Sequence, residues 1–262
     1  MKNSLSIKSA FGIVFLSLIS AFFSGALVIS IGLTKPESSQ KFYNFLSFVI
    51  GQSFMLIPLI YFLKSKNESI IKRLRLKLIN TNTILNTLFI SFGIVVLSDE
   101  LDRIIQIIWP APDYILNLNS LLQPETVLEF VLLFLAIVII APLGEELLFR
   151  GFLQQILEKN WSDITRAILI TSLVFATIHM NVYWFIQIYF LGIILGFLAW
   201  KTKSVLPSLI LHGINNAMAL TFAMIDIEKY SIYIWNGHVA PWFVISSLIC
   251  IKIGFKNINK IK

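Results

Sequence analysis

Residues 127–152 read VLEFVLLFLAIVIIAPLGEELLFRGF and give the clearest indication of the fold. It is mostly apolar and long enough to cross a bilayer, for which an α-helix needs about 20 residues. Near its end stand Glu145, Glu146 and Arg150. An ionisable group at bilayer depth costs about 2.5–3.5 kcal/mol on insertion scales, so such a group by default marks a functional site. The stretch therefore predicts a membrane-spanning helix that carries a polar site.

The rest of the chain has the composition of a membrane protein. Hydrophobic residues make up 57% of its 262 residues, charged residues 13%, and the mean hydropathy is +0.82. A soluble domain of this length could not bury so much apolar surface. We therefore predict an all-α polytopic membrane helix bundle with about eight transmembrane helices. The expected spans are Ala10–Leu33, Phe42–Leu63, Ile84–Leu97, Val127–Phe149, Ile164–His179, Tyr183–Trp200, Leu206–Met224 and Tyr233–Ile251.

The positions of Lys and Arg predict the orientation of these spans, because basic residues concentrate in cytoplasmic loops. With the N-terminus in the cytoplasm, the inner segments hold most of them, including the cluster from Lys64 to Lys77 and the C-terminal tail. Both termini are therefore expected inside. The net charge of +7 then follows from topology and from attraction to anionic lipid, so no nucleic-acid partner is expected.

Several catalytic classes lack their sequence motifs. The single cysteine, Cys250, allows neither a disulfide within one chain nor a cysteine-based metal site, and its place in the last span indicates a packing role. The sequence contains no Gly-x-Ser-x-Gly, no phosphate-binding Gly-rich loop with its Lys, and no His-Glu-x-x-His. These absences disfavour a serine hydrolase, a nucleotide-driven pump and an ordinary zincin.

Helical geometry separates the two adjacent glutamates. Glu146 and Arg150 are four residues apart and share a helix face, where the guanidinium can neutralise the carboxylate. Glu145 is turned by about 100° from Glu146 and has no such partner on its helix. A carboxylate without a counter-ion in an apolar surround binds a proton more readily, as a general acid or base near neutral pH requires. The alternative is that both acids only cap a cytoplasmic helix end.

His179 is expected at the same depth as Glu145. On neighbouring antiparallel helices that rise 1.5 Å per residue, both would lie about 22–25 Å from the turn at Asn160–Asp163. Phe175, one turn before His179, shares its face and is expected to wall the pocket. The alternative is that His179 is a hydrogen-bonded histidine at the end of its span.

His212 and Asn216 form a third pair, again four residues apart on one helix face. Both can donate hydrogen bonds, and donors that converge on a developing oxyanion are a common device of acyl-transfer catalysis. The alternative is that the two side chains hydrogen-bond across helices and only hold the bundle together. His238 is expected near the last outer loop and is assigned no role.

Taken together, the three motifs resemble the CAAX protease and bacteriocin-processing family of intramembrane proteases, which includes the type II CAAX prenyl endopeptidases. The motifs are Glu-Glu-x-x-x-Arg at 145–150, Phe-x-x-x-His at 175–179 and His-x-x-x-Asn at 212–216, and the resemblance covers about residues 128–224. It implies a helix bundle that hydrolyses a peptide bond within the membrane. It further implies that Glu145 is the catalytic base and His179 its partner. His212 and Asn216 would stabilise the tetrahedral intermediate.

In the mechanism we prefer, Glu145, helped by His179, takes a proton from a water that attacks the scissile carbonyl. His212 and Asn216 then bind the oxyanion, and no cofactor is required. The supporting residues are Glu146, Arg150 and Phe175.

A metalloprotease mechanism is the alternative for the same residues. Two histidines and a carboxylate suffice to hold a catalytic zinc ion. The ligands would be Glu145, His179 and His212.

We expect three regions: N-terminal transmembrane helices at 1–125, a catalytic helical core at 126–225, and a last helix with a basic tail at 226–262. The expected function is that of an integral, multi-pass endopeptidase of the cell membrane, acting on a membrane-associated or lipidated protein or peptide. Two other classes stay open. One is a non-catalytic member of the fold that serves bacteriocin immunity or regulates a membrane sensor. The other is an ion-coupled transporter, which would need paired broken helices in both halves of the chain.

Overall fold

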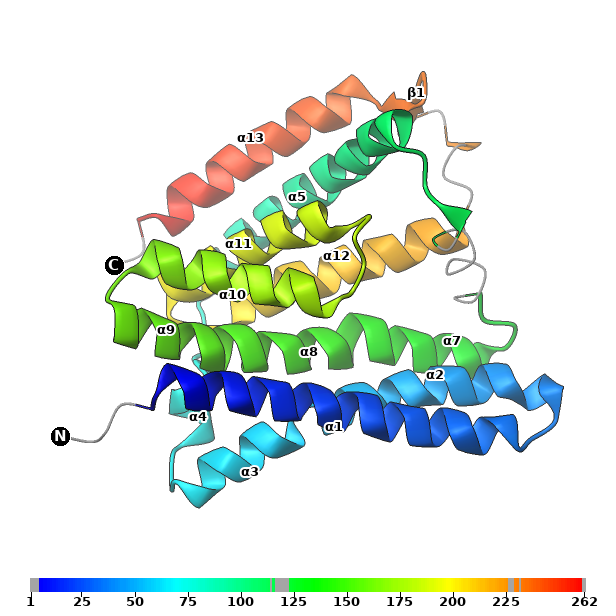
Figure 1. Cartoon of the computed structure of the whole chain (residues 1–262). Coiled ribbons are helices and arrows are strands. Elements are labelled where there is room, and N and C mark those ends of the chain that lie inside the picture. Colours follow the sequence, from blue (N-terminus) through cyan, green and yellow to red (C-terminus); the bar gives the residue numbers. More distant parts are fainter. Residues whose placement is uncertain (1–4, 114, 116–122, 226–228, 231, 261–262) are drawn as a thin grey trace.

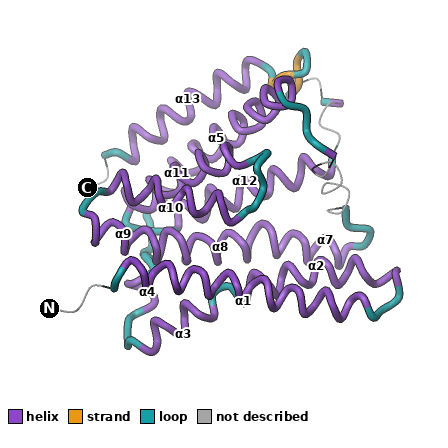
Figure 2. Tube along the Cα trace, viewed as in Figure 1, coloured by secondary structure: helices purple, strands orange, loops and turns teal. Residues whose placement is uncertain are grey.

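The computed structural model of the chain is a bundle of helices with one short hairpin at one end (Figure 1). It describes all residues except 1–4, 114, 116–122, 226–228, 231 and 261–262. Helices make up most of the described chain (Figure 2). The helical elements are α1 (Ile7–Leu33), α2 (Glu37–Phe54), α3 (Ile57–Ser65), α4 (Ile70–Arg73), α5 (Thr81–Ile108), α7 (Val127–Phe134), η1 (Leu135–Ile140), α8 (Ala141–Glu145), η2 (Glu146–Leu153), α9 (Gln154–Trp161), α10 (Ile164–Ile178), α11 (Phe185–Thr202), α12 (Leu206–Met224) and α13 (Pro241–Ile258). Strands β1 (Ile234–Trp235) and β2 (His238–Val239) pair antiparallel.

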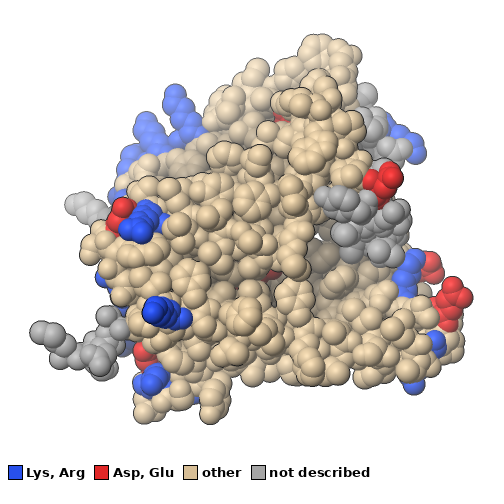
Figure 3. All heavy atoms as spheres, viewed as in Figure 1, with Lys and Arg blue, Asp and Glu red and all other residues tan. Residues whose placement is uncertain are grey.

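The bundle has the properties of an integral, multi-pass membrane protein. Charged side chains gather toward its two ends, and the visible face between them is almost free of charge (Figure 3). Figure 1 places the start of α1 and the end of α13 at one end, called here the terminal end, and the hairpin at the other, the far end. Among the described residues, six helical segments are long and apolar enough to cross a membrane: Ile7–Leu33, Glu37–Ser65, Thr81–Ile108, Val127–Trp161, Phe185–Thr202 and Pro241–Ile258.

The predicted all-α polytopic bundle is therefore confirmed. Two helices from the predicted set of about eight, α10 and α12, are not among these six segments. α10 packs against α9 and α11, whereas α12 packs against α5, α11 and η1. Both thus lie within the bundle, and both carry predicted site residues.

The bounds of α5, of the second span and of the last span differ from the sequence predictions. α5 runs from Thr81 to Ile108, well beyond Ile84–Leu97, because its polar end stays helical. There Asp99 and Arg103 pair one turn apart, with Nε 3.2 Å from Oδ2. The second span breaks between α2 and α3 just before Pro58, which lacks the N–H of a continuous helix. The last span begins at Pro241 and not at Tyr233, since the hairpin occupies the residues before it.

The helix that carries the glutamates is longer than predicted and contains two π-helical segments. It runs without a break from Val127 to Trp161, beyond the predicted end at Phe149. The π segments η1 and η2 flank the single turn of α8, which begins at Ala141–Pro142. Proline has no N–H to donate, and its ring displaces the carbonyl four residues earlier, here that of Val138. A π segment directly before Pro142 follows from this, and such segments occur frequently at functional sites.

The terminal end is tied together by the segment between α4 and α5. Gln155 Nε2 donates to the carbonyl of Arg73 (2.7 Å), and the Val205 N–H donates to the carbonyl of Arg75 (3.0 Å). Gly151 lets this segment approach η2, since a Cβ there would lie 2.9 Å from the Leu74 carbonyl oxygen. The segment predicted only as a basic cytoplasmic loop therefore also anchors the helix that carries the site.

Candidate active site

The predicted site residues come from three helices. The long helix supplies Glu145, Glu146 and Arg150, while His179 caps the end of α10 and His212 lies on α12. Every residue of η2 is buried, so its charged side chains face protein and not lipid. Ionisable groups inside a membrane bundle are expected to pair in this way.

Glu146 lies at the centre of the cluster and accepts two hydrogen bonds on the same oxygen. Its Oε1 lies 2.8 Å from Nη1 of Arg150 and 3.0 Å from Nδ1 of His212. The three side chains are 0–4% exposed. The contact with Arg150 follows from the four-residue spacing. The contact with His212 joins two helices, so the sequence pattern of neither helix predicts it. Since a carboxylate only accepts, His212 presents Nδ1–H to Glu146, which leaves Nε2 facing away from Glu146.

Arg150 is held by two further contacts. Its Nη2 donates to the carbonyl of Gly192 on α11 (3.3 Å), and its guanidinium lies 4.1 Å from the ring centre of Phe175. One turn later, Gln154 Nε2 donates to the carbonyl of Gly196 (2.9 Å). Two glycines four residues apart allow helices to approach closely in membranes. Sequence reasoning missed Gln154, although the matching four-residue spacings on the two helices were a usable signal.

Glu145 lies on the other side of the same imidazole. Its Oε2 is 3.7 Å from Nε2 of His212, longer than a direct hydrogen bond, and the Glu145 side chain is 11% exposed. The sequence led us to expect a carboxylate without a counter-ion. The structure differs because α12 comes close enough to bring His212 between the two glutamates. Gly213 makes this approach possible, since a Cβ there would lie 3.2 Å from the Val138 carbonyl oxygen.

His179 contacts Phe175 and not Glu145. Its Nδ1 lies 2.7 Å from the Phe175 carbonyl oxygen, and its ring meets the Phe175 ring edge to face at 4.8 Å. The same phenyl ring lies 5.7 Å from the imidazole of His212. No hydrogen bond or ion pair joins Glu145 and His179 in the described part of the chain. The imidazole belongs to the residue just past the end of α10, where it folds back onto the preceding turn and stays exposed.

Asn216 supplies a hydrogen bond that the backbone of the long helix lacks. Its Nδ2 donates to the carbonyl of Ile137 in η1 (3.0 Å). In a π segment that carbonyl would accept from the N–H five residues later, and this position is Pro142, which has none. One amide hydrogen of Asn216 is thus engaged with the backbone, and the second stays available as a donor.

The three residues predicted as zinc ligands do not form a metal site in this structure. Across the described ranges, no group of three His, Cys, Asp or Glu side chains has a geometry that could hold a metal ion. His179 is turned onto Phe175, so its imidazole does not converge with Glu145 and His212 on one point. As they are arranged here, the three side chains therefore do not fit a bound zinc ion.

The visible face of the bundle has a hollow (Figure 3). In Figure 3 it lies on the visible face between α7 and α12, beside the turn that joins α10 to α11. α10 has 15 residues and α5 has 28, so the α10–α11 turn stops short of the far end. Because α10 is shorter than its neighbours, a space remains beyond its end, where the hollow lies.

The fold and its buried carboxylates, imidazole and guanidinium define a polytopic membrane protein with a polar site inside the bundle. Residues 127–218 match the protein family described as Type II CAAX prenyl endopeptidase Rce1-like. Over these residues the match confirms the predicted resemblance to the CAAX protease and bacteriocin-processing family, a family of intramembrane proteases. No curated protein and no solved structure matches the chain.

Proposed function

We propose that the protein is an active intramembrane endopeptidase in which Glu145 is the general base and His212 the main oxyanion donor. The observation that carries this proposal is the position of the His212 imidazole, with Nδ1 3.0 Å from Glu146 and Nε2 3.7 Å from Glu145. Glu146 thus orients the imidazole through Nδ1, and the opposite ring nitrogen, Nε2, faces Glu145.

The proposal assigns a hydrogen to each ring nitrogen of His212, with Nδ1–H toward Glu146 and Nε2–H on the side of Glu145. Glu146 already pairs with Arg150, so Glu145 is the carboxylate without an arginine partner. Nε2–H is then a donor and the Glu145 carboxylate is an acceptor, as hydrolysis requires at its first step.

The reaction follows from these two groups. Glu145 accepts a proton from water as the water oxygen bonds to the scissile carbon, and the electron pair of the carbonyl bond moves onto the oxygen. The Nε2–H of His212 and the free amide hydrogen of Asn216 stabilise this oxyanion. When the intermediate collapses, the bond between carbon and nitrogen breaks, and the proton on Glu145 passes to the leaving amine. No metal ion takes part in this sequence.

His179 keeps a role in the proposal, but not as a direct partner of Glu145. It is exposed at the end of α10 and contacts the same phenyl ring as His212. We propose that His179 binds the attacking water or the substrate backbone beside the ring of Phe175. Its position at the end of α10 and the apolar face of the bundle favour a membrane-associated protein or peptide as the substrate.

The function is tested with Glu145→Gln, which keeps the size and polarity of the side chain and removes the base. Cells that express wild-type or variant protein are compared by mass spectrometry of the new peptide termini in their membrane fraction. We expect a set of termini that appears with the wild type and is lost with the variant. The matched control is Glu129→Gln, a second buried glutamate of the same helix, in the capping box with Thr126.

If cells with wild-type protein and cells with Glu145→Gln yield the same set of new peptide termini, at equal amounts of folded protein, the proposed protease activity is contradicted. That result would favour the non-catalytic role in immunity or sensing. Loss of cleavage in Glu129→Gln as well would show that the effect comes from helix stability and not from the base.

A further inference from the structure

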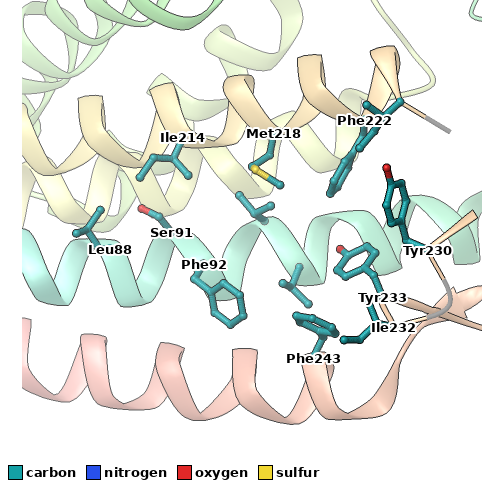
Figure 4. Close-up of a pocket in the computed structure, with 13 residues that line it drawn as sticks. Leu88, Ser91, Phe92, Ile214, Met218, Phe222, Tyr230, Ile232, Tyr233 and Phe243 are labelled. Atoms are coloured by element: carbon teal, nitrogen blue, oxygen red, sulfur yellow. The ribbon is translucent and has the colours of Figure 1, made fainter. Parts of the chain in front are cut away.

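A second cavity lies behind α12, on the side away from the active site. It is bounded by α5, α12 and the start of α13, and its volume is about 510 Å³ (Figure 4). Its walls include Leu88, Phe92, Ile214, Met218, Phe222 and Tyr233. This volume lies within the range of pockets that hold small ligands, roughly 300–1,000 Å³.

α12 separates this groove from the catalytic residues. Ile214 follows His212 by two residues, a rotation of about 200° around the helix. Figure 4 shows Ile214, Met218 and Phe222 on the side of α12 that faces α5. Asn216 instead reaches the opposite neighbour, η1. The groove is therefore a separate site.

The lining is suited to a hydrocarbon chain. Ser91, the one hydroxyl on its α5 wall, donates to the carbonyl of Thr87 (2.8 Å) and is fully buried. At the edges of the groove, Leu88 is 41%, Phe92 39% and Ile232 70% exposed. The groove is thus continuous with the surface of the bundle that faces lipid, and the surrounding bilayer can supply its occupant.

The length of the groove suits an extended chain better than a helix. The α5 wall, from Leu88 to Val96, is about 12 Å long at 1.5 Å per residue, or little more than two helical turns. A single acyl chain is narrow enough to lie along this wall.

The far end of the groove is aromatic and polar. Tyr230 is 53% exposed there, and Tyr233 lines the wall beside it. Burial, and then the nearby Asp99 carboxylate, raise the pKa of Tyr233, so its hydroxyl stays neutral at physiological pH. Tyr residues are typical of the level of lipid headgroups, where their rings meet the acyl chains and their hydroxyls meet the polar region.

We propose that the groove behind α12 binds one acyl chain of a bilayer phospholipid, with the ester end of the lipid at the exposed Tyr230. The chain runs from there along Phe222 and Met218 toward Leu88. Because it fills the space behind the helix that carries His212, the lipid is a structural ligand of α12.

The site is tested by photochemical labelling. The full-length protein is placed in vesicles of phosphatidylethanolamine and phosphatidylglycerol that contain a trace phospholipid with a diazirine at the end of one acyl chain. The protein is then extracted in detergent and separated from bulk lipid before irradiation, so that only retained lipid can label it. We expect label on groove residues of α5 and α12, several-fold above the label on the lipid-facing residues Phe15 and Phe22 of α1.

Filling the groove should remove the label. Met218→Trp adds bulk to its centre, and Leu88→Trp adds bulk to its other end and serves if the first variant does not fold. Each should lower labelling of the groove several-fold. Phe89→Trp is the matched control, because Phe89 is an exposed α5 residue outside the groove and should leave the label unchanged.

Three results would overturn the proposal. The first is groove labelling no higher than that of α1, as loosely attached lipid would give. The second is labelling that both filling variants leave unchanged. The third is a dimer in detergent whose groove residues cross-link to a second copy without lipid.

Discussion

The Nδ1 atom of His212 lies 3.0 Å from the Oε1 atom of Glu146, and this contact joins two of the three motifs of the site. The same oxygen is bonded to Arg150, so one carboxylate holds both a guanidinium and an imidazole. A group that fixes one ring nitrogen of a histidine decides how the other can act. In the proposed mechanism, Glu146 is therefore a positioning residue for His212 and not only the counter-ion of Arg150.

Removal of Arg150 should destabilise the fold more than removal of the whole ion pair. Arg150→Ala leaves Glu146 as a buried carboxylate without its strongest partner, and breaking a buried pair from one side costs about 3–5 kcal/mol. The double variant Glu146→Gln with Arg150→Met leaves no unpaired charge and should recover part of this loss. The free energy of unfolding in mixed detergent micelles measures both effects.

The double variant should nevertheless stay inactive, because glutamine replaces the carboxylate that accepts from Nδ1 of His212. Activity restored together with stability would show that Glu146 acts only through Arg150. Equal stability of the single and double variants would show that the two side chains do not interact.

Asn216 and Pro142 should be energetically coupled. Asn216→Ala leaves the Ile137 carbonyl without its donor, and an unsatisfied buried polar group costs about 1–3 kcal/mol. In a Pro142→Ala background, the new N–H can serve the carbonyls of η1, so the same change should cost less. A double-mutant cycle on the free energy of unfolding measures the difference.

Activity separates the two roles of Asn216. If its second amide hydrogen faces the oxyanion, Asn216→Ala should lower the rate by about 10²–10³ even in the Pro142→Ala background, in which the backbone is satisfied. Full rescue of activity by Pro142→Ala would show that Asn216 acts only on the helix.

Sequence patterns predicted the parts of the site that depend on one helix. The spacing of Glu146 and Arg150 is local, and their contact follows from it. The bounds of α12 also match the predicted Leu206–Met224, since Pro207 and an apolar run define them. Local helical geometry suffices for such features.

Contacts between helices could not be predicted in this way. The depth match of Glu145 and His179 assumes a regular α-helix from Glu145 to the turn at Asn160, whereas η2 changes the rotation and rise per residue within that stretch. His179 also lies just past the last turn of α10, where its ring turns onto Phe175. His212 takes the place beside Glu145 because Gly213 lets α12 approach, and a single sequence gives the glycine but not the helix it packs against.

Orientation in the membrane should follow the basic residues. In a Cys250→Ala background, Lys72→Cys and Lys260→Cys at the terminal end should resist an impermeant thiol reagent added to intact cells. Asp113→Cys and Gln123→Cys, beyond the opposite ends of α5 and the long helix, should react. Labelling of Lys72→Cys from outside would reverse the proposed orientation, and permeabilised cells provide the control for accessibility.

The last prediction separates a glutamate mechanism from a metal mechanism. Purified active protein should keep its cleavage activity after dialysis against a chelator, because the proposed mechanism uses Glu145 as the base and His212 as the oxyanion donor and needs no metal ion. Elemental analysis should find no stoichiometric metal in the wild type, and His212→Ala should abolish the rate without a change in metal content. His179→Gln should lower the rate less than His212→Ala, because His179 lies outside the buried cluster. Near-stoichiometric zinc in active protein, lost in both histidine variants and required for activity, would show that the two histidines and Glu145 come together around a metal ion.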